Sequence, residues 1–77
     1  MSTAWVLIQA DTGSLKDVYV RLLGMDSVSE THVVYGEYDL VARIDFTDEV
    51  GMAKILIGGM RSIEGIRKTE TLVAVEV

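Results

Sequence analysis

The middle of the chain contains a stretch that predicts a β-hairpin. Val33 to Tyr35 supplies β-branched and aromatic residues, and an apolar run resumes at Leu40 after a few polar residues. Such residues suit a half-buried pleated surface, and the short polar interruption is typical of a turn. Gly36 can adopt a positive φ in that turn without a Cβ clash. Two adjacent antiparallel strands are therefore expected, with the second running to Phe46, and the other segments must be arranged around them.

Two segments with a helical period flank this hairpin. The first follows Ser14, which with Asp17 suits a helix N-terminus, and ends near Gly24. The second follows Thr47, whose hydroxyl we expect to cap the helix. The pair Gly58-Gly59 either ends this helix early or lies within it, so its last residue is not fixed by the sequence. Each segment carries one apolar stripe, which predicts a face packed on the core. The stripes are Leu15, Val18, Tyr19, Leu22 and Leu23 in the first, and Met52, Ala53, Leu56, Ile57 and Met60 in the second.

Four strands are expected in all, from Thr3 to Ala10, Val28 to Tyr35, Leu40 to Phe46 and Ile66 to Val77. The order strand, helix, strand, strand, helix, strand predicts an α+β, ferredoxin-like βαββαβ fold: a four-stranded antiparallel sheet with two helices on one face. The 77 residues suit one domain, 1–77. We expect Leu40, Ala42, Ile44 and Phe46 to face the helices. The other face should pack on a second subunit through Trp5, Leu7, Val41, Val73 and Val75.

Composition excludes several classes of function. A net charge of −5 argues against direct nucleic-acid binding, which needs Lys and Arg to neutralise phosphates. The absence of any apolar run near 20 residues predicts no membrane span, and the absence of cysteine agrees with a reducing compartment, so a cytoplasmic protein is expected. A chain this small buries only about 60% of its unfolded surface. With 49% hydrophobic residues, it should therefore cover the excess by forming a homo-oligomer.

Groups for catalysis are missing from the sequence. His32 is the only histidine, no cysteine can act as a nucleophile, and no glycine-rich phosphate loop precedes a helix. Two histidines at metal-ligand spacing are also absent, so we expect neither a metal nor another cofactor. These observations predict a binding protein rather than an enzyme.

The hairpin tip has the chemistry that an amino acid requires. A ligand with a neighbouring ammonium and carboxylate needs a negative acceptor close to N–H or hydroxyl donors. Asp39 or Glu37 can accept from the ammonium, with Asp39 the preferred candidate. Backbone N–H groups around Gly36, together with Thr69 and Thr71, can bind the carboxylate.

The same segments carry a family resemblance. The run Val-Val-Tyr-Gly-Glu-Tyr-Asp-Leu, followed after a helix by Ile63-Glu64-Gly65-Ile66 and Thr69-Glu70-Thr71, resembles the effector-binding RAM domain of Lrp/AsnC feast/famine regulators across practically the whole chain. Full-length members carry an N-terminal helix-turn-helix, whereas the first strand here begins by about residue 3, so the chain resembles a stand-alone RAM protein. The resemblance implies face-to-face sheet dimers, rings of dimers, and amino-acid effectors in clefts between dimers. The matching positions are Val34, Tyr35, Gly36, Glu37, Tyr38 and Asp39, with Thr69 and Thr71.

Three functions are compatible with these features of the sequence. The leading hypothesis is an oligomeric regulatory protein that senses an amino acid, alone or in mixed oligomers with full-length Lrp/AsnC regulators. The first alternative is an assembly partner of such regulators that binds no effector. The second is a dimeric α+β barrel enzyme, which a polar residue buried on the helix-facing side of the sheet would support.

Overall fold

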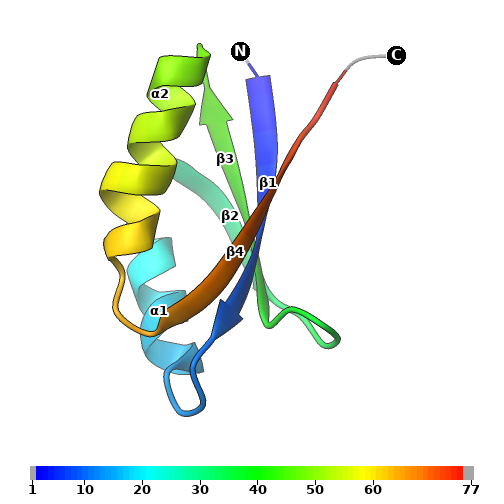
Figure 1. Cartoon of the computed structure of the whole chain (residues 1–77), viewed down its shortest axis with the longest axis vertical. Helices are drawn as coiled ribbons and strands as arrows, with labels where there is room; N and C mark the ends of the chain where they lie inside the picture. Colours follow the sequence, from blue (N-terminus) through cyan, green and yellow to red (C-terminus); the bar gives the residue numbers. More distant parts are fainter. Residues whose placement is uncertain (1, 76–77) are drawn as a thin grey trace.

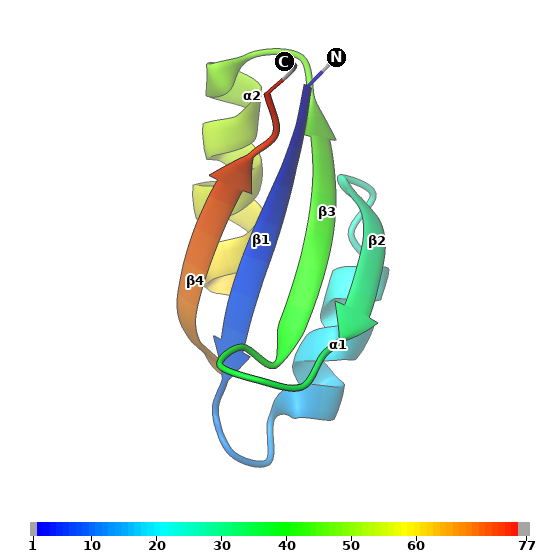
Figure 2. The same cartoon turned by 90° about the vertical axis from the view of Figure 1, so that its right-hand side faces the viewer.

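The computed structural model describes residues 2–75, which form one sheet covered by helices on one face (Figures 1 and 2). The strands are β1 (Ser2–Ala10), β2 (Val28–Val33), β3 (Leu40–Phe46) and β4 (Ile66–Val73). They pair in the order β2-β3-β1-β4, with every pair antiparallel. One helix, α1 (Leu15–Leu23), follows β1, and a longer helical segment follows β3. The predicted ferredoxin-like fold is confirmed.

The core lies between the sheet and the helices. Alternate residues of β1 and β3 point into it, and the predicted helix-facing set of β3 is buried as expected. From the helices, Val18, Leu22 and Met60 are buried against these strands. Leu15 and Leu23 of the first predicted stripe are exposed; they are the first and last residues of α1, whereas Val18 and Leu22 between them are buried. The buried apolar residues are Ala4, Val6, Ile8, Ala10, Val18, Leu22, Leu40, Ala42, Ile44, Phe46, Met60 and Ile63.

The second helical segment changes its hydrogen-bond pattern along its length. It begins as α2 (Glu49–Ala53), continues as the π-helix η1 (Lys54–Gly59) and tightens to the 3₁₀ turn η2 (Met60–Ser62). Its cap is Asp48 rather than the predicted Thr47, since the Asp48 carboxylate accepts from the Gly51 N–H at 2.7 Å.

The glycine pair does not end this segment. A Cβ on Gly59 would lie 2.8 Å from the Met25 Cε atom, so close packing explains this glycine. Gly58 faces open space. The helix therefore continues through both glycines to Ser62.

Two face assignments made from the sequence are wrong. In the β1–β4 ladder, Thr69, Thr71 and Val73 stand opposite Ile8, Val6 and Ala4, and residues directly opposite each other share a face. Val73 therefore belongs to the helix-facing side, and Leu72, opposite Trp5, takes its place on the outer face. Val75 lies beyond the end of β4. Residues 76 and 77, which the sequence assigned to this strand, are outside the described part of the chain.

A bulge in β2 causes the second difference. Val28 stands opposite Ile44 and Glu30 opposite Arg43, which leaves Ser29 as an extra residue between them. The bulge puts Val28 on the helix-facing side, whereas strict alternation along an unbulged strand would place it on the same face as Glu30 and His32. The strand also ends at Val33 rather than at Tyr35, because residues 34–39 form the loop to β3.

Candidate functional site

The hairpin loop, residues 34–39, folds back across the outer face of the sheet instead of projecting from its end (Figure 2). The Val34 N–H donates to the Asp39 carbonyl at 2.9 Å and closes the loop. Gly36 has a φ of 147°, a conformation that L side chains rarely adopt. The predicted role of this glycine in the turn is confirmed.

Three hydrogen bonds attach the loop to the end of β1. The Asp39 N–H donates to the Ile8 carbonyl at 2.9 Å. The Asp39 carboxylate in turn accepts from the Ala10 N–H through Oδ2 at 2.9 Å. Gln9 donates from Nε2 to the Glu37 carbonyl at 2.8 Å. The carboxylate that the sequence favoured for a ligand ammonium is therefore already bound to the backbone, and it fixes the path of the loop.

A fourth contact joins the loop to β4. The Tyr38 hydroxyl donates to Glu70 Oε2 at 2.9 Å, and Lys68 Nζ lies 5.9 Å from the centre of the Tyr38 ring. The hydrogen bond to the Glu70 carboxylate raises the pKa of Tyr38, because this bond is lost when the phenol ionises. Tyr38 thus ties the loop to the edge strand through one side chain. The sequence did not indicate this role, because only the observed register shows that Glu70 and Lys68 face outward.

The remaining groups of the loop face solvent. Tyr35 is fully exposed at 106%, and within residues 2–75 no hydrogen bond involves its side chain or the Glu37 carboxylate. The N–H groups of Gly36 and Glu37 likewise make no hydrogen bond in this part of the chain. A free carboxylate and free donors therefore lie next to each other at the tip.

The two threonines lie on the other side of the sheet. Thr69 and Thr71 share the helix-facing side of β4 and line a groove of about 220 Å³ between that strand and the second helical segment. Within one chain, the structure does not bring the threonines to the hairpin tip, which contacts β4 through its outward residues. A single site made from both sets needs two copies of the chain, as the family resemblance implies. The groove was missed because its apolar wall had been assigned wholly to the core.

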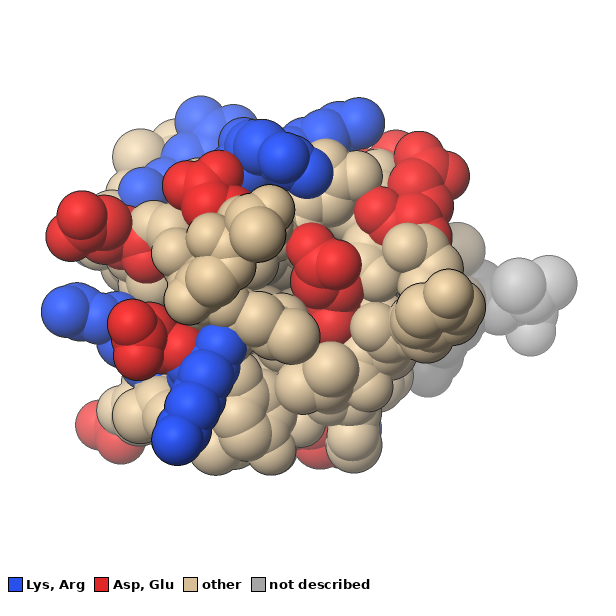
Figure 3. Space-filling view, turned by 90° about the horizontal axis from the view of Figure 1, so that it is seen from below, with Lys and Arg blue, Asp and Glu red and all other residues tan. Residues whose placement is uncertain are grey.

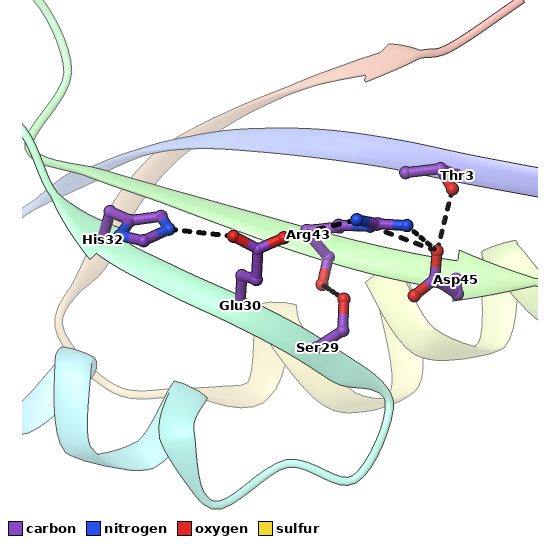
Figure 4. A network of polar contacts seen from close by, with 6 residues as sticks. All are labelled: Thr3, Ser29, Glu30, His32, Arg43 and Asp45. Atoms are coloured by element: carbon purple, nitrogen blue, oxygen red, sulfur yellow. Dashed lines mark hydrogen bonds and ion pairs between the residues drawn. The ribbon is translucent and has the colours of Figure 1, made fainter.

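A chain of polar contacts crosses the outer face beside the loop (Figure 4). Thr3 donates to Asp45 at 2.8 Å, Arg43 pairs with Asp45 and Glu30 at 3.3 Å each, and Glu30 contacts His32 at 3.1 Å. The hydrogen bond from Thr3 and the Arg43 guanidinium lower the pKa of Asp45. The contact with His32, followed by that with Arg43, lowers the pKa of Glu30. The network was not predicted from the sequence, although charged or ionisable residues stand at alternate positions of β2 (Glu30, His32) and of β3 (Arg43, Asp45).

Apolar side chains lie beside this network on the outer face, from β3 across β1 to the edge strand β4. Trp5, Leu7 and Val41 are half-buried, and Leu72 beside them is exposed. The Arg43 guanidinium carbon lies 5.9 Å from the centre of the Trp5 ring. We call Trp5, Leu7, Val41 and Leu72 the outer-face strip. The position predicted for Trp5, Leu7 and Val41 on the helix-free face is confirmed.

Residues 2–75 were also compared with the requirements of a metal site, a membrane span and an enzyme active site. No group of three or more His, Cys, Asp or Glu side chains is placed to hold a metal ion there. In the same part of the chain, no helix is long and apolar enough to cross a membrane. The polar side chain buried on the helix-facing side is Thr31, a single hydroxyl whose Oγ1 has no hydrogen-bond partner in this region. Thr31 thus meets the criterion that the sequence set for the barrel-enzyme alternative, but a lone hydroxyl supplies neither a general acid nor a general base for catalysis.

Comparison with known families decides the classification. The family model described as the Lrp/AsnC ligand binding domain matches residues 3–77. The chain belongs to the Lrp/AsnC family. It is 33% identical over 76 residues to an uncharacterized HTH-type transcriptional regulator of Pyrococcus furiosus, covering 95% of this chain and 51% of that protein. The chain thus spans about half the length of the curated relatives that it matches, and this domain is a regulatory ligand-binding domain by family.

Solved structures share the fold. The crystal structure of TTHA0845 from Thermus thermophilus superimposes with a TM-score of 0.93 at 32% identity, covering 100% of this chain and 96% of that one. A transcriptional regulator from Neisseria meningitidis, solved as a complex with L-Met, has a TM-score of 0.88 at 13% identity and covers 97% of this chain and 50% of that one. At that identity the second likeness concerns the fold alone.

Proposed function

We propose that this domain is an amino-acid receptor within an Lrp/AsnC-type regulatory assembly. The observation that carries the proposal is the hairpin loop, which is held in place by its own hydrogen bonds and leaves the Glu37 carboxylate beside unbonded N–H groups. A preorganised pair of this kind suits a ligand that has an ammonium next to a carboxylate. The L-Met complex of the Neisseria regulator is an instance of such a ligand on this fold.

Within the loop, Glu37 is the better ammonium acceptor. Asp39 already accepts from the Ala10 N–H, and displacing that bond would leave a backbone donor unpaired. Within residues 2–75, Glu37 makes a hydrogen bond only through its carbonyl, so its carboxylate can meet a ligand without such a loss. We therefore reassign the role that the sequence gave to Asp39 and keep Val34 to Asp39, Thr69 and Thr71 as the site.

The site is completed by a second copy of the chain. Glu37 and Thr69 lie on opposite sides of the sheet, so the threonines of one copy would meet the hairpin tip of another. The outer-face strip, with the ionic network at its border, suits sheet-to-sheet dimers. Further association of these dimers would bring the hairpin tip of one copy to Thr69 and Thr71 of another. Related full-length regulators, which share the fold, are the other partners that we propose.

Isothermal titration with each of the standard amino acids tests the receptor. We expect binding by at least one of them, and Glu37→Gln should weaken it by about tenfold, the effect of losing a charge-assisted hydrogen bond of about 1.4 kcal/mol. Glu64→Gln, which removes an equal charge from the loop before β4, is the control and should leave the affinity unchanged. Absence of binding by every amino acid would refute the receptor, and co-purification with a full-length regulator would then favour the effector-free assembly partner.

A further inference from the structure

The outer face of the sheet carries the one histidine of the chain, His32. In the β2–β3 ladder, His32 stands directly opposite Val41, and residues directly opposite each other share a face. Val41 belongs to the outer-face strip, so the imidazole lies at the border of that strip. The His32 side chain is 60% exposed, so solvent protons can reach it and a partner can cover it.

This histidine gives the outer face a charge that depends on pH. Histidine is the side-chain type that changes its charge between pH 5 and 8. The sequence contains one histidine and no cysteine, so no second side chain of either type competes with His32 in this range. The Glu30 carboxylate lies 3.1 Å from the His32 Nε2 atom, and its contacts with His32 and then Arg43 lower its pKa. A negative acceptor therefore lies beside the imidazole when it gains a proton.

The other charges of this network are paired within one chain. Arg43 meets Glu30 and Asp45 at 3.3 Å each, and Thr3 donates to Asp45 at 2.8 Å. The strand β1 adds no charge to the outer face. Its outward residues are Thr3, Trp5, Leu7 and Gln9. His32 is thus the member of the network whose charge changes near neutral pH.

Carboxylates outnumber cations on the outer face of residues 2–75, including the hairpin loop that lies over it. The carboxylates are Glu30, Glu37, Asp39, Asp45 and Glu70, and the cations are Arg43 and Lys68. Figure 3 views the molecule from below, with the side that carries the outer face on the right. Carboxylates and uncharged residues occupy that side, and basic side chains gather along the upper edge and on the left. Two such faces repel each other when they are brought together, and the repulsion falls when each His32 gains a proton.

We propose that His32 makes the association of two copies through the outer face depend on pH, with the protonated form of each copy favouring the dimer. A second copy fits this face because the strip is apolar and the charges of Arg43 and Asp45 at its border are already paired, so an identical strip can cover it in a symmetric interface. The inference rests on the sheet-to-sheet dimer of the proposed function, and it adds the group that regulates that dimer.

The direction of the pH effect follows from linkage. Relief of repulsion by protons means that the dimer binds them more tightly than two separate copies do, so association strengthens as the pH falls through the range in which histidine titrates. The proposed amino-acid site needs more than one copy of the chain, and it would therefore form more readily at the lower pH.

Sedimentation equilibrium of the whole chain without any amino acid tests this regulation. The dimer dissociation constant should be at least about fivefold smaller at about pH 5.5 than at about pH 7.5, because each of the two histidines changes an exposed charge interaction that is worth a few-fold in an equilibrium constant. His32→Gln should show one constant at both pH values, close to that of the wild type at the higher pH. His32→Lys carries a fixed positive charge, and it should show the tighter constant at both.

A matched control separates the position of the histidine from the net charge of the chain. Val20→His, made in the His32→Gln background, returns a histidine to a position that is 56% exposed on α1, on the opposite side of the molecule. The net charge of this double variant changes with pH as that of the wild type does, but its dimer constant should not change. Both positions are exposed, so all variants should keep the wild-type circular dichroism spectrum at both pH values.

The remaining outcomes overturn the inference in distinguishable ways. A wild-type dimer with one constant at both pH values, or a His32→Gln variant that keeps the wild-type pH dependence, would overturn the role of His32 and leave the dimer standing. A pH dependence restored by Val20→His would assign the effect to net charge instead. A monomer at both pH values would overturn the inference together with the sheet-to-sheet dimer of the proposed function, whereas amino-acid binding is measured separately by titration.

Discussion

At the scale of single residues, the carboxylate of Asp39 stabilises the protein by accepting from the Ala10 N–H at 2.9 Å. Asp39→Ala removes that acceptor and leaves a partly buried N–H unpaired, so we expect the free energy of unfolding to fall by roughly 1–3 kcal/mol. Asp39→Asn keeps an oxygen that can accept, and its cost should be less than half as large. Urea denaturation of both variants measures the difference. Equal losses in the two variants would show that charge, rather than the hydrogen bond, is the stabilising property.

At the scale of the hairpin loop, Tyr38 and Glu70 form a contact that depends on pH. The hydrogen bond raises the pKa of Tyr38 above its ordinary value of 10.0, so the stabilisation is complete below that value and is lost as the pH rises through the folded-state pKa. We expect Glu70→Gln to lower the pKa of Tyr38 and Glu64→Gln to leave it unchanged. NMR titration of the tyrosine ring carbons reports it directly. A pKa that does not move in Glu70→Gln would contradict the observed contact.

The elements themselves were predictable because their signals are local. Each apolar stripe and each alternating run lies within one segment, and the order of segments then selects the fold. The faces of β4 were not predictable in this way, because each side carries an apolar residue, Val73 on one and Leu72 on the other. Only the register with β1 decides which of them faces the helices. The bulge at Ser29 and the return of the loop over β1 also depend on contacts between distant segments. The candidate site residues of the hairpin were proposed from their chemistry. The hydrogen bond between Asp39 and the Ala10 N–H was not predicted, since Ala10 gives no sequence signal for it.

At the scale of the whole molecule, one face of the sheet has no helix of residues 2–75 over it and carries the outer-face strip. Leu72 is 50% exposed in the single chain, and a small domain with such a face is stabilised by covering it. We expect the protein to dimerise through this face. Leu72→Glu would bury a second carboxylate beside Glu70 in that interface, and it should shift the dimer to monomers at micromolar concentration.

The control for this interface lies on the opposite side of the molecule. Val20, on α1, is 56% exposed, so Val20→Glu introduces the same charge at a matched exposure without touching the sheet. Light scattering should give a dimer or a multiple of it for the wild type and Val20→Glu, and a smaller species for Leu72→Glu alone. Because the proposed amino-acid site needs two copies of the chain, Leu72→Glu should also weaken amino-acid binding while Glu37 and Thr69 remain intact. A monomeric wild type would refute the dimer, and a Leu72→Glu variant that keeps both its size and its affinity would place the interface elsewhere.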